Sequence, residues 1–426
     1  MPKALIITYY WPPAGGPGVQ RWLKFVKYLP DFGITPIVYI PENPNYPLVD
    51  TSFTQDIPKD ITIYKHPIRE PYKLARIFSK QKTKRISSGI IKSEDQSIIE
   101  KIMLWVRGNF YIPDARKNWV KPSVNYLKGI IEKEGISTII TTGPPHSVHL
   151  IGASLKEQLG VHWISDFRDP WTSIGYHNKL RLSTRSKRRH KQMERSVLNS
   201  SDHIIVTSYT TKKEFATITH KPISVITNGF DSDYNGNTSL DDHFTMSHVG
   251  SLLSGRNPSN LWTVLSELIK EHAEFAAHFK LQLVGVVSED VLDSINEHGL
   301  KGHIQVLGYV THEEAVSYQQ RSQLLLLVEI NSNETIGILP GKLYEYMAAR
   351  RPILAVGPTG WEAGRLISET KTGATFEYSS KSDLKNVILD WFKSYRENKL
   401  FVEQGEIEKY HRRELTHTLA TLIKWE

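Results

Sequence analysis

A strand, turn, helix and strand pattern in the last third of the chain constrains the fold most. It begins with the apolar run Gln323–Ile330, breaks at Pro340 and Gly341, continues with helix-forming residues, and resumes after Pro352 as the apolar run Ile353–Val356. Proline cannot continue a helix, and short apolar runs of this kind are typical of strands buried on both faces of a parallel sheet. The pattern therefore predicts a helix that opens at Pro340 and joins two parallel strands.

The start of that predicted helix has residue types suited to a phosphate. A helix N-terminus presents free backbone N–H groups and a positive dipole end. Lys342 lies in the first turn as a mobile positive charge, and Glu345, three residues further on the same face, can accept hydrogen bonds from sugar hydroxyls. The alternative is that Lys342 and Glu345 form a surface ion pair on an ordinary crossover helix.

Chain length and charge distribution indicate two domains of opposite net charge. A chain of 426 residues is long for one domain and comfortable for two. Residues 1–230 contain 34 Lys+Arg and 18 Asp+Glu, a net charge of +16, so the remainder contains 19 and 27, a net charge of −8. We expect the basic half to meet an acidic partner: an anionic bilayer, a phosphorylated acceptor or nucleic acid.

The lack of cysteine limits the chemistry. With no cysteine, the chain has no disulfide, no thiolate metal site and no cysteine nucleophile, which fits a reducing compartment. The sequence also contains no run of about eighteen apolar residues and no signal-peptide pattern. We therefore expect a cytoplasmic protein without a membrane-spanning helix.

A glycine-rich loop follows the first predicted strand. Gly15, Gly16 and Gly18 come after the apolar run Lys3–Thr8 and precede a helical pattern. Strand, loop and helix in this order are the opening of a doubly wound sheet, whose ligands bind at the carboxyl ends of the strands. The spacing is not G-x-G-x-x-G, and a tight turn without a ligand is the alternative.

Two further loops of the first half carry polar side chains after a strand. His146 and His149 follow the strand that ends at Gly143, where a histidine can act as a general base or a hydrogen-bond donor, although a lone histidine is more often structural. In the next loop Arg168 lies between Asp166 and Asp169. We expect these three to form a network, either at a reacting site or as a structural lock.

Basic stretches with interspersed apolar residues occur in the first half, at residues 73–92, 105–121 and 179–195. Aromatic rings between arginines and lysines suit a membrane interface, where the cations attract anionic lipid. The alternatives are a helix pair packed on the core with snorkelling cations and, for the last stretch, a simple solvated face.

The second half repeats the alternation of strands and loops. Gly250 and Ser251 end the predicted strand that starts at Phe244, and Arg256 follows in the loop, where a guanidinium suits diphosphate oxygens. Gly308 and Tyr309 end another strand, and Gly308 by itself is also an ordinary turn residue.

Taken in order along the chain, these motifs resemble those of the retaining GT-B glycosyltransferases of the family-four type. A glutamate near the start of the helix holds the donor ribose in that family, and Glu345 matches it. The family has a second glutamate eight residues earlier, where this chain has Gly337. Glu334 or the backbone amides of residues 336–338 are candidates to replace it.

The resemblance implies an α/β fold with two doubly wound Rossmann-like domains that face one another across a cleft. Residues 1–232 would bind the acceptor, residues 233–403 would bind the nucleotide sugar, and residues 404–426 would form a helix that crosses back to the first domain. The site residues implied are the catalytic His146 and Asp169 and the nucleotide-sugar-binding Gly16, Gly250, Arg256, Gly308, Tyr309, Gly337, Lys342, Leu343 and Glu345.

The expected reaction moves a hexose-type sugar from a nucleoside-diphosphate sugar to an acceptor hydroxyl with retention. Cationic side chains and a helix dipole can stabilise the leaving diphosphate directly, so we expect neither a metal nor a cofactor. The expected acceptor is a glycan or a lipid-linked sugar of a cell-surface polysaccharide or glycolipid, reached from the inner face of the plasma membrane. A sugar-nucleotide epimerase of the same fold is one alternative. A nucleic-acid-binding protein is another, although no recognition helix or stacking motif is present and nucleic acid is not an expected partner.

Overall fold

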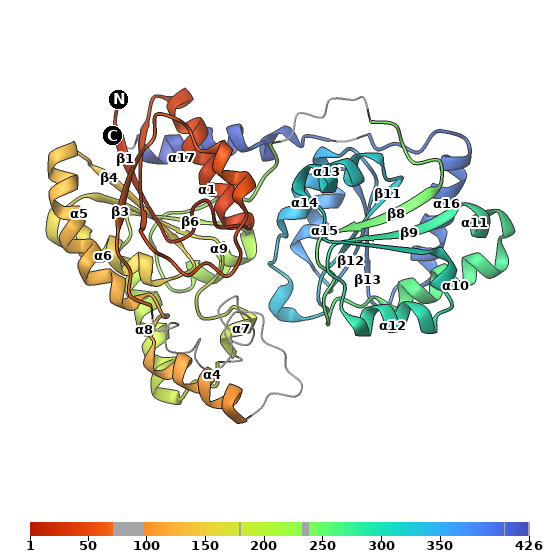
Figure 1. Ribbon diagram of the computed structural model, residues 1–426, viewed down its shortest axis with the longest axis horizontal. Coiled ribbons are helices and arrows are strands. Elements are labelled where there is room, and N and C mark those ends of the chain that lie inside the picture. The colour runs from red at the N-terminus through yellow and green to blue at the C-terminus, as the bar shows by residue number, and fades with distance from the viewer. Residues whose placement is uncertain (71–97, 179, 232–237, 404, 425–426) are drawn as a thin grey trace. The chain divides into compact units, whose positions relative to one another are not determined.

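The computed structural model describes residues 1–70, 98–178, 180–231, 238–403 and 405–424. They form two compact α/β units (Figure 1): the first runs from Met1 to Thr227 and resumes at Arg412, and the second runs from Asn228 to His411. The predicted domain boundaries involve residues 232, 233 and 404, which lie outside the described ranges. So does the basic stretch at residues 73–92.

The first unit contains a seven-stranded parallel sheet in the order β3-β2-β1-β4-β5-β6-β7. The sheet grows outward in both directions from β1 and β4, so these neighbours mark its topological switch point. The strands are β1 (Lys3–Thr8), β2 (Thr35–Pro41), β3 (Thr62–His66), β4 (Thr138–Gly143), β5 (His162–Phe167), β6 (His203–Val206) and β7 (Ile223–Val225).

Helices cover both faces of this sheet, because successive strand residues point to opposite sides and both sides are apolar. Leu5 and Ile7 pack into one buried cluster, and Ala4 and Ile6 pack into the other. The helices of this unit are α1 (Pro17–Tyr28), α4 (Ile98–Phe110), α5 (Val120–Glu134), α6 (Ser147–Leu159), α7 (Gly175–Asn178), α8 (Thr184–Ser200), α9 (Tyr209–Ala216) and α17 (Arg412–Ile423). The last of these, α17, packs beside α1 in the same cluster as Ala4.

The second unit has six parallel strands in the corresponding order, β10-β9-β8-β11-β12-β13, with its switch point between β8 and β11. The strands are β8 (Phe244–Val249), β9 (Phe279–Val284), β10 (Ile304–Gly308), β11 (Leu324–Val328), β12 (Ile353–Gly357) and β13 (Gly373–Glu377). The helices are α10 (Ser259–Glu271), α11 (Ala273–His278), α12 (Glu289–Glu297), α13 (His312–Arg321), α14 (Gly341–Ala348), α15 (Glu362–Glu369) and α16 (Ser382–Arg396). Short 3-10 helices in the two units are η1 (Leu29–Phe32), η2 (Thr51–Asp56), η3 (Lys117–Trp119), η4 (Lys301–His303), η5 (Asn333–Thr335) and η6 (Glu408–Tyr410).

The predicted strand–helix–strand pattern is confirmed in this second unit. The helix α14 begins at Gly341, directly after Pro340, and joins β11 to its neighbour β12. Leu324 and Leu326 pack on one face of the sheet and Leu325 on the other, so an uninterrupted apolar run is required here. The expected architecture of two doubly wound α/β domains is therefore confirmed. Within the described ranges, no helix has both the length and the apolar character needed to cross a bilayer.

Candidate functional site

The switch point of the second sheet gathers polar groups from several distant segments. Gly250 follows β8, and Glu329 follows the neighbouring strand β11. The helix α14 begins nearby with Pro340 as its N-cap residue, and no side chain caps its free N–H groups. The carboxyl ends of parallel strands meet at one edge of a sheet, so this edge combines an uncapped helix start with the side chains described below.

Lys342, in the first turn of α14, is held by a histidine. Its Nζ lies 3.1 Å from Nε2 of His248, the penultimate residue of β8. Nδ1 of His248 lies 2.9 Å from the backbone oxygen of Leu326, so the ring donates there and Nε2 accepts from the lysine. Burial, reinforced by the charge of Lys342, lowers the pKa of His248 well below its usual value. The histidine is therefore a neutral acceptor for the ammonium group.

The pKa of Lys342 is lowered by its surroundings. Burial, followed by the positive charge of Arg256, lowers its pKa to about 8, although two nearby carboxylates act in the opposite direction. An anion bound beside Lys342 would favour the charged form of the lysine and would therefore raise its pKa.

Arg256 is fixed by a carboxylate that the sequence analysis missed. Its Nη2 lies 2.9 Å and its Nε 3.1 Å from Oε1 of Glu329, a residue that is 1% exposed, while the arginine is 29% exposed. Glu329 thus orients the guanidinium and leaves part of it accessible. Within the sequence this glutamate is hidden in the apolar run Gln323–Ile330, and its position directly after the buried strand is the signal that could have revealed it.

Glu345 lies half-buried on the next turn of α14. Its Oε2 accepts a hydrogen bond from Nε2 of Gln319, at 3.1 Å, and Gln319 belongs to α13. The structure shows no ion pair between Lys342 and Glu345, because Lys342 is bound to His248 instead. The surface ion pair considered above is therefore not formed. The neighbouring Leu343 is fully buried in the core, and its backbone N–H donates to Pro340.

Two positions at this edge require glycine, one for its backbone conformation and one for a close backbone approach. Gly250 has a φ of +111°, in the left-handed region, and a Cβ there would lie 2.7 Å from the Nζ of Lys342. A Cβ at Gly285, which follows β9, would lie 2.6 Å from the backbone oxygen of Gly250. Gly308 ends the adjacent strand β10 and accepts a hydrogen bond from the N–H of Gly285, at 2.7 Å. The next residue, Tyr309, is 78% exposed.

Gly337 lies in the loop between η5 and α14. The backbone oxygens on either side of it are anchored: Ile336 accepts from the N–H of Glu362, at 2.9 Å, and Ile338 accepts from Nε1 of Trp361, at 2.8 Å. The side chain of Glu334 is exposed. The loop around Gly337 is thus anchored through the backbone oxygens of its two neighbours.

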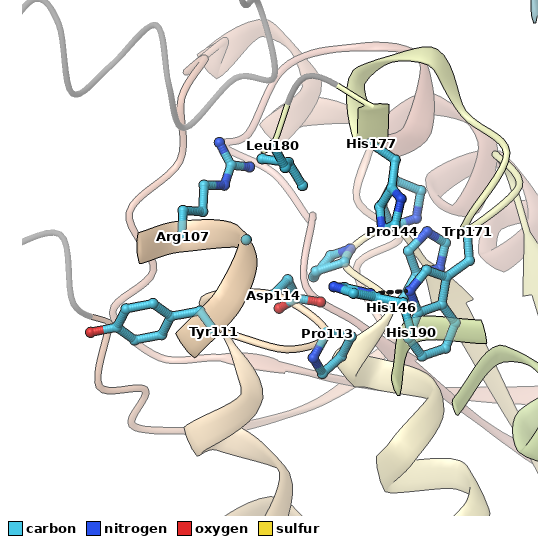
Figure 2. Close-up of a pocket in the computed structure, with 12 residues that line it drawn as sticks. Arg107, Tyr111, Pro113, Asp114, Pro144, His146, Trp171, His177, Leu180 and His190 are labelled. Carbon is cyan, nitrogen blue, oxygen red and sulfur yellow. Dashed lines mark hydrogen bonds between the residues drawn. The ribbon is translucent and has the colours of Figure 1, made fainter. Parts of the chain in front are cut away.

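His146 lines a cavity in the first unit, at the end of β4 (Figure 2). Its ring is 4% exposed and stacks on Trp171, with 4.9 Å between the ring centroids and 3° between the planes. Neither ring nitrogen has a hydrogen-bond partner in the described structure. Burial, reinforced by the neighbouring His149, lowers the pKa of His146 well below its usual value, so the ring is neutral and available to donate or accept one hydrogen bond.

Other titratable side chains surround the same cavity. Asp114 caps the start of α6, where its carboxylate accepts from the backbone N–H and the hydroxyl of Ser147 at 2.8 and 2.9 Å. His190 of α8 accepts from Nε1 of Trp171 at 3.1 Å, and His177 and Arg107 complete the polar wall. The cavity volume of about 40 Å³ suits a few water molecules or a polar tip of a ligand.

The expected hydrogen-bond network of Asp166, Arg168 and Asp169 is wrong, because Asp166 and Arg168 bond to other groups. Asp166 is fully buried and accepts from Arg21, Trp22 and Thr142, at 3.0, 2.7 and 2.7 Å. It is a structural lock between α1 and the neighbouring strands. Arg168 instead donates to the backbone oxygens of Gly143 and Pro144.

Asp169 follows Arg168 in the chain, and the glycine-rich loop lies against the guanidinium through Gly18. Burial raises the pKa of Asp169, and the charge of Arg168 opposes that rise. Gly16 precedes α1 with a φ of +107°, and a Cβ at Gly18 would overlap the guanidinium of Arg168. The glycine-rich loop therefore allows Arg168 to pack against the start of α1.

The site residues thus form two groups, one in each unit. The second unit gathers Gly250, Arg256, Gly308, Lys342 and Glu345 at one sheet edge, and the first unit contains His146, Asp169 and Gly16. Sequence reasoning missed His248, Glu329, Gln319 and Gly285. Among the residues that the structure describes, no group of three or more His, Asp or Glu is arranged to hold a metal ion.

Two families match consecutive parts of the chain. Residues 92–234 match the family described as Glycosyltransferase Family 4, and residues 233–407 match Glycosyl transferases group 1. A comparison with curated protein sequences found no match.

Solved structures share the fold over the full length. HepE from Anabaena, in complex with UDP, is 12% identical with a TM-score of 0.57, and the match covers 99% of this chain and 95% of HepE. WaaG, a glycosyltransferase involved in lipopolysaccharide biosynthesis, is 12% identical with a TM-score of 0.53, and TarM from S. aureus is 12% identical with a TM-score of 0.58; both matches cover 100% of each chain. Together with the two family matches, this shared fold shows that the chain belongs to the GT-B glycosyltransferases of the family-four type, which transfer a sugar from a nucleotide sugar.

Proposed function

We propose that this protein transfers a hexose-type sugar from a nucleoside-diphosphate sugar to an acceptor hydroxyl, with retention, in the synthesis of a cell-surface polysaccharide or glycolipid. The observation that carries the proposal is the group at the start of α14. The positive charges of Lys342 and Arg256 interact with one another at an uncapped helix N-terminus, and Glu345 lies on the same helix. This arrangement suits a diphosphate with a ribose attached.

The proposed roles follow from the charges. Arg256 and Lys342 offset the negative charge that develops on the diphosphate as its bond to the anomeric carbon breaks. Glu345 accepts from the ribose hydroxyls. The acceptor oxygen bonds to the anomeric carbon on the same face that the diphosphate leaves, and the departing phosphate oxygen takes the acceptor's proton. Because two cations and the helix dipole face the leaving group, we propose that the reaction needs no metal ion.

In the first unit, the neutral ring of His146 supplies a hydrogen bond to a substrate hydroxyl at the cavity, and Asp169 lies at the end of the neighbouring strand. We propose a glycan or a lipid-linked sugar as the acceptor. HepE has been solved with UDP and with UDP-glucose, and TarM with UDP and glycan ligands, which supports a nucleotide-sugar donor and a glycan acceptor for this chain.

Thermal denaturation with a panel of nucleoside diphosphates and their sugars tests the donor site. A ligand at a hundred times its Kd stabilises the native state by about 2.7 kcal/mol, so the correct base gives a clear rise in Tm. Lys342→Gln should remove that rise, and Lys301→Gln, which neutralises an exposed lysine of the same unit, should not.

Product analysis then separates the candidate reactions. Sugar transfer that persists in EDTA supports the proposal, and transfer that EDTA abolishes and Mg²⁺ or Mn²⁺ restores contradicts its metal-free form. An epimerised free sugar nucleotide, formed without any acceptor, would assign the protein to the epimerases instead. If no nucleotide changes the Tm, the donor site itself is wrongly assigned.

A further inference from the structure

The helix α4 exposes its apolar side chains. Ile102, Trp105, Val106 and Phe110 are 56%, 45%, 36% and 61% exposed, and their spacing of three or four residues places them along one face of the helix. The opposite face packs inward through Leu104, which is 2% exposed. A continuous apolar face of this kind on a soluble unit marks a surface that binds a partner.

The helix α8 beside it is basic. Six exposed cations lie on it, and the structure shows none of them in an ion pair: Arg185, Lys187, Arg188, Arg189, Lys191 and Arg195. The acidic residue of this helix, Glu194, is buried and accepts from the backbone N–H and hydroxyl of Thr172. The positive charge of α8 is therefore not compensated within the helix.

The two helices are joined into one surface. The side chain of Asn109, in α4, accepts from the N–H of Ser183, the N-cap residue of α8, at 2.8 Å and donates to the backbone oxygen of Arg181 at 3.2 Å. A Cβ at Gly108 would lie 2.6 Å from the backbone oxygen of Leu180, so the close approach requires glycine. Figure 1 shows α4 and α8 at the same end of the first unit.

We infer that α4 and α8 dock this protein on an anionic bilayer. Tryptophan and phenylalanine side chains enter the headgroup region, while arginines and lysines beside them attract anionic lipid. A second copy of this chain would bring two basic helices together, which like charges oppose. The phosphates of a nucleic acid would pair with the cations of α8 but would leave the apolar face of α4 in water. An anionic bilayer accommodates both the cations and the apolar face.

The structure also corrects the expected extent of this surface. The stretch at residues 105–121 divides after Phe110: Trp119 is 2% exposed, and Arg116 is buried in an ion pair with Glu70, with 3.0 Å between Nε and Oε1. The first part therefore presents the exposed apolar side chains, and the second part contributes Trp119 and Arg116 to the buried interior.

Docking would also present the cavity of the first unit to the bilayer. Arg107 of α4 and His190 of α8 both line that cavity, together with His146 (Figure 2). This second step rests on the proposed function, because it makes a lipid-linked acceptor the natural substrate of the cavity. The docking itself does not depend on the function.

Flotation of the full chain with vesicles tests the electrostatic part. We expect binding to vesicles of equal parts phosphatidylcholine and phosphatidylglycerol, weakened by salt, and none to phosphatidylcholine alone. Each lost cation weakens binding about fivefold, so the triple variant Arg188→Gln, Arg189→Gln, Lys191→Gln should lower the partition coefficient roughly a hundredfold. The matched control is Lys133→Gln, Lys212→Gln, Lys213→Gln, which removes three exposed lysines from α5 and α9.

Fluorescence quenching by brominated lipid tests the apolar part. Trp105 is the exposed tryptophan among the described residues, so Trp105→Phe should remove most of the quenching without preventing flotation. The pair Ile102→Ser, Phe110→Ser should weaken flotation, and the control pair Val286→Ser, Phe401→Ser, on exposed residues of the second unit, should leave it unchanged.

Three results would overturn the inference: equal flotation with both kinds of vesicle, no flotation with either, or quenching that survives Trp105→Phe. A concentration-dependent dimer that Ile102→Ser, Phe110→Ser dissolves would assign the apolar face to a second copy and would also overturn it. The rise in Tm with the donor nucleotide, measured on the same variants without lipid, reports the proposed function separately.

Discussion

The Nζ of Lys342 lies 3.1 Å from Nε2 of His248, so the ammonium at the start of α14 is held by a neutral ring and not by a carboxylate. A neutral acceptor orients the lysine without cancelling its charge. Arg256 differs, because the group that fixes its direction is a carboxylate, that of Glu329, 2.9 Å from its Nη2. The two cations of the candidate donor site are therefore oriented by different groups. The lowered pKa of Lys342 makes its charge depend on pH near 8.

Binding of UDP should take up protons near pH 8. The pKa of Lys342 is lowered to about 8, so a fraction of the free protein has a neutral lysine there, and the diphosphate favours its charged form. Affinity should fall as the pH rises above 8. Calorimetry in buffers of different ionisation enthalpy measures the uptake. Lys342→Gln should remove it and Lys301→Gln should retain it; uptake that persists in Lys342→Gln belongs to another group.

The same pKa shift predicts the effect on stability. The lysine is protonated up to about pH 10.5 in the unfolded chain and up to about pH 8 in the native protein, so the unfolded state binds more protons between these values. The contribution of Lys342 to the free energy of unfolding therefore rises with pH across this window. Urea unfolding at both ends of the window, compared between the wild type and Lys342→Gln, isolates this contribution. An identical pH dependence in both proteins would contradict the shift.

His248 should act on UDP through Lys342. His248→Asn removes the acceptor at Nε2, so the lysine loses its fixed position and UDP affinity falls. Residues in direct contact show coupling energies of about 0.5–3 kcal/mol, so a double-mutant cycle with Lys342→Gln should be non-additive. His298→Asn, in the same unit, is the control and should be additive. Additive losses for His248→Asn would show that this histidine supports the fold without positioning the lysine.

Gly250→Ala should weaken UDP binding more than its effect on stability explains. The new Cβ would lie 2.7 Å from the Nζ of Lys342 and would displace it. Gly299 also has a positive φ, +77°, but a Cβ there meets nothing within 4 Å, so Gly299→Ala carries the backbone strain alone, about 1–2 kcal/mol. Kd and Tm measured for both variants separate the two effects. Equal changes in Kd would attribute the loss at Gly250 to strain.

Asp166→Asn should destabilise the first unit by about 3–5 kcal/mol, because Arg21 would stay buried without its carboxylate. The amide would also place an N–H group against one of the donors that Asp166 now accepts from. Urea unfolding measures the loss, and Asp60→Asn, at an exposed position, is the control. A loss below about 1 kcal/mol, the value typical of a surface ion pair, would contradict the assignment of Asp166 as a structural lock.

Local sequence was sufficient to predict the second unit's central crossover. Pro340 and Gly341 end one segment and open α14, and the uninterrupted apolar residues of β11 require burial on both faces of a sheet. These are short-range effects of backbone geometry and hydrophobicity, so they can be recognised from neighbouring residues alone. The same reasoning placed Lys342 and Glu345 at the start of that helix.

The partners of those residues were decided only by the tertiary structure. His248 and Lys342 are 94 positions apart, and Arg256 and Glu329 are 73 apart, yet each pair meets because parallel strands end at one edge of the sheet. The sequence predicted that Asp166 would interact with its neighbour Arg168. In the structure Asp166 accepts hydrogen bonds from Arg21, Trp22 and Thr142 instead. A buried charge takes whichever donors the packing brings to it, and spacing along the chain does not specify which donors those are.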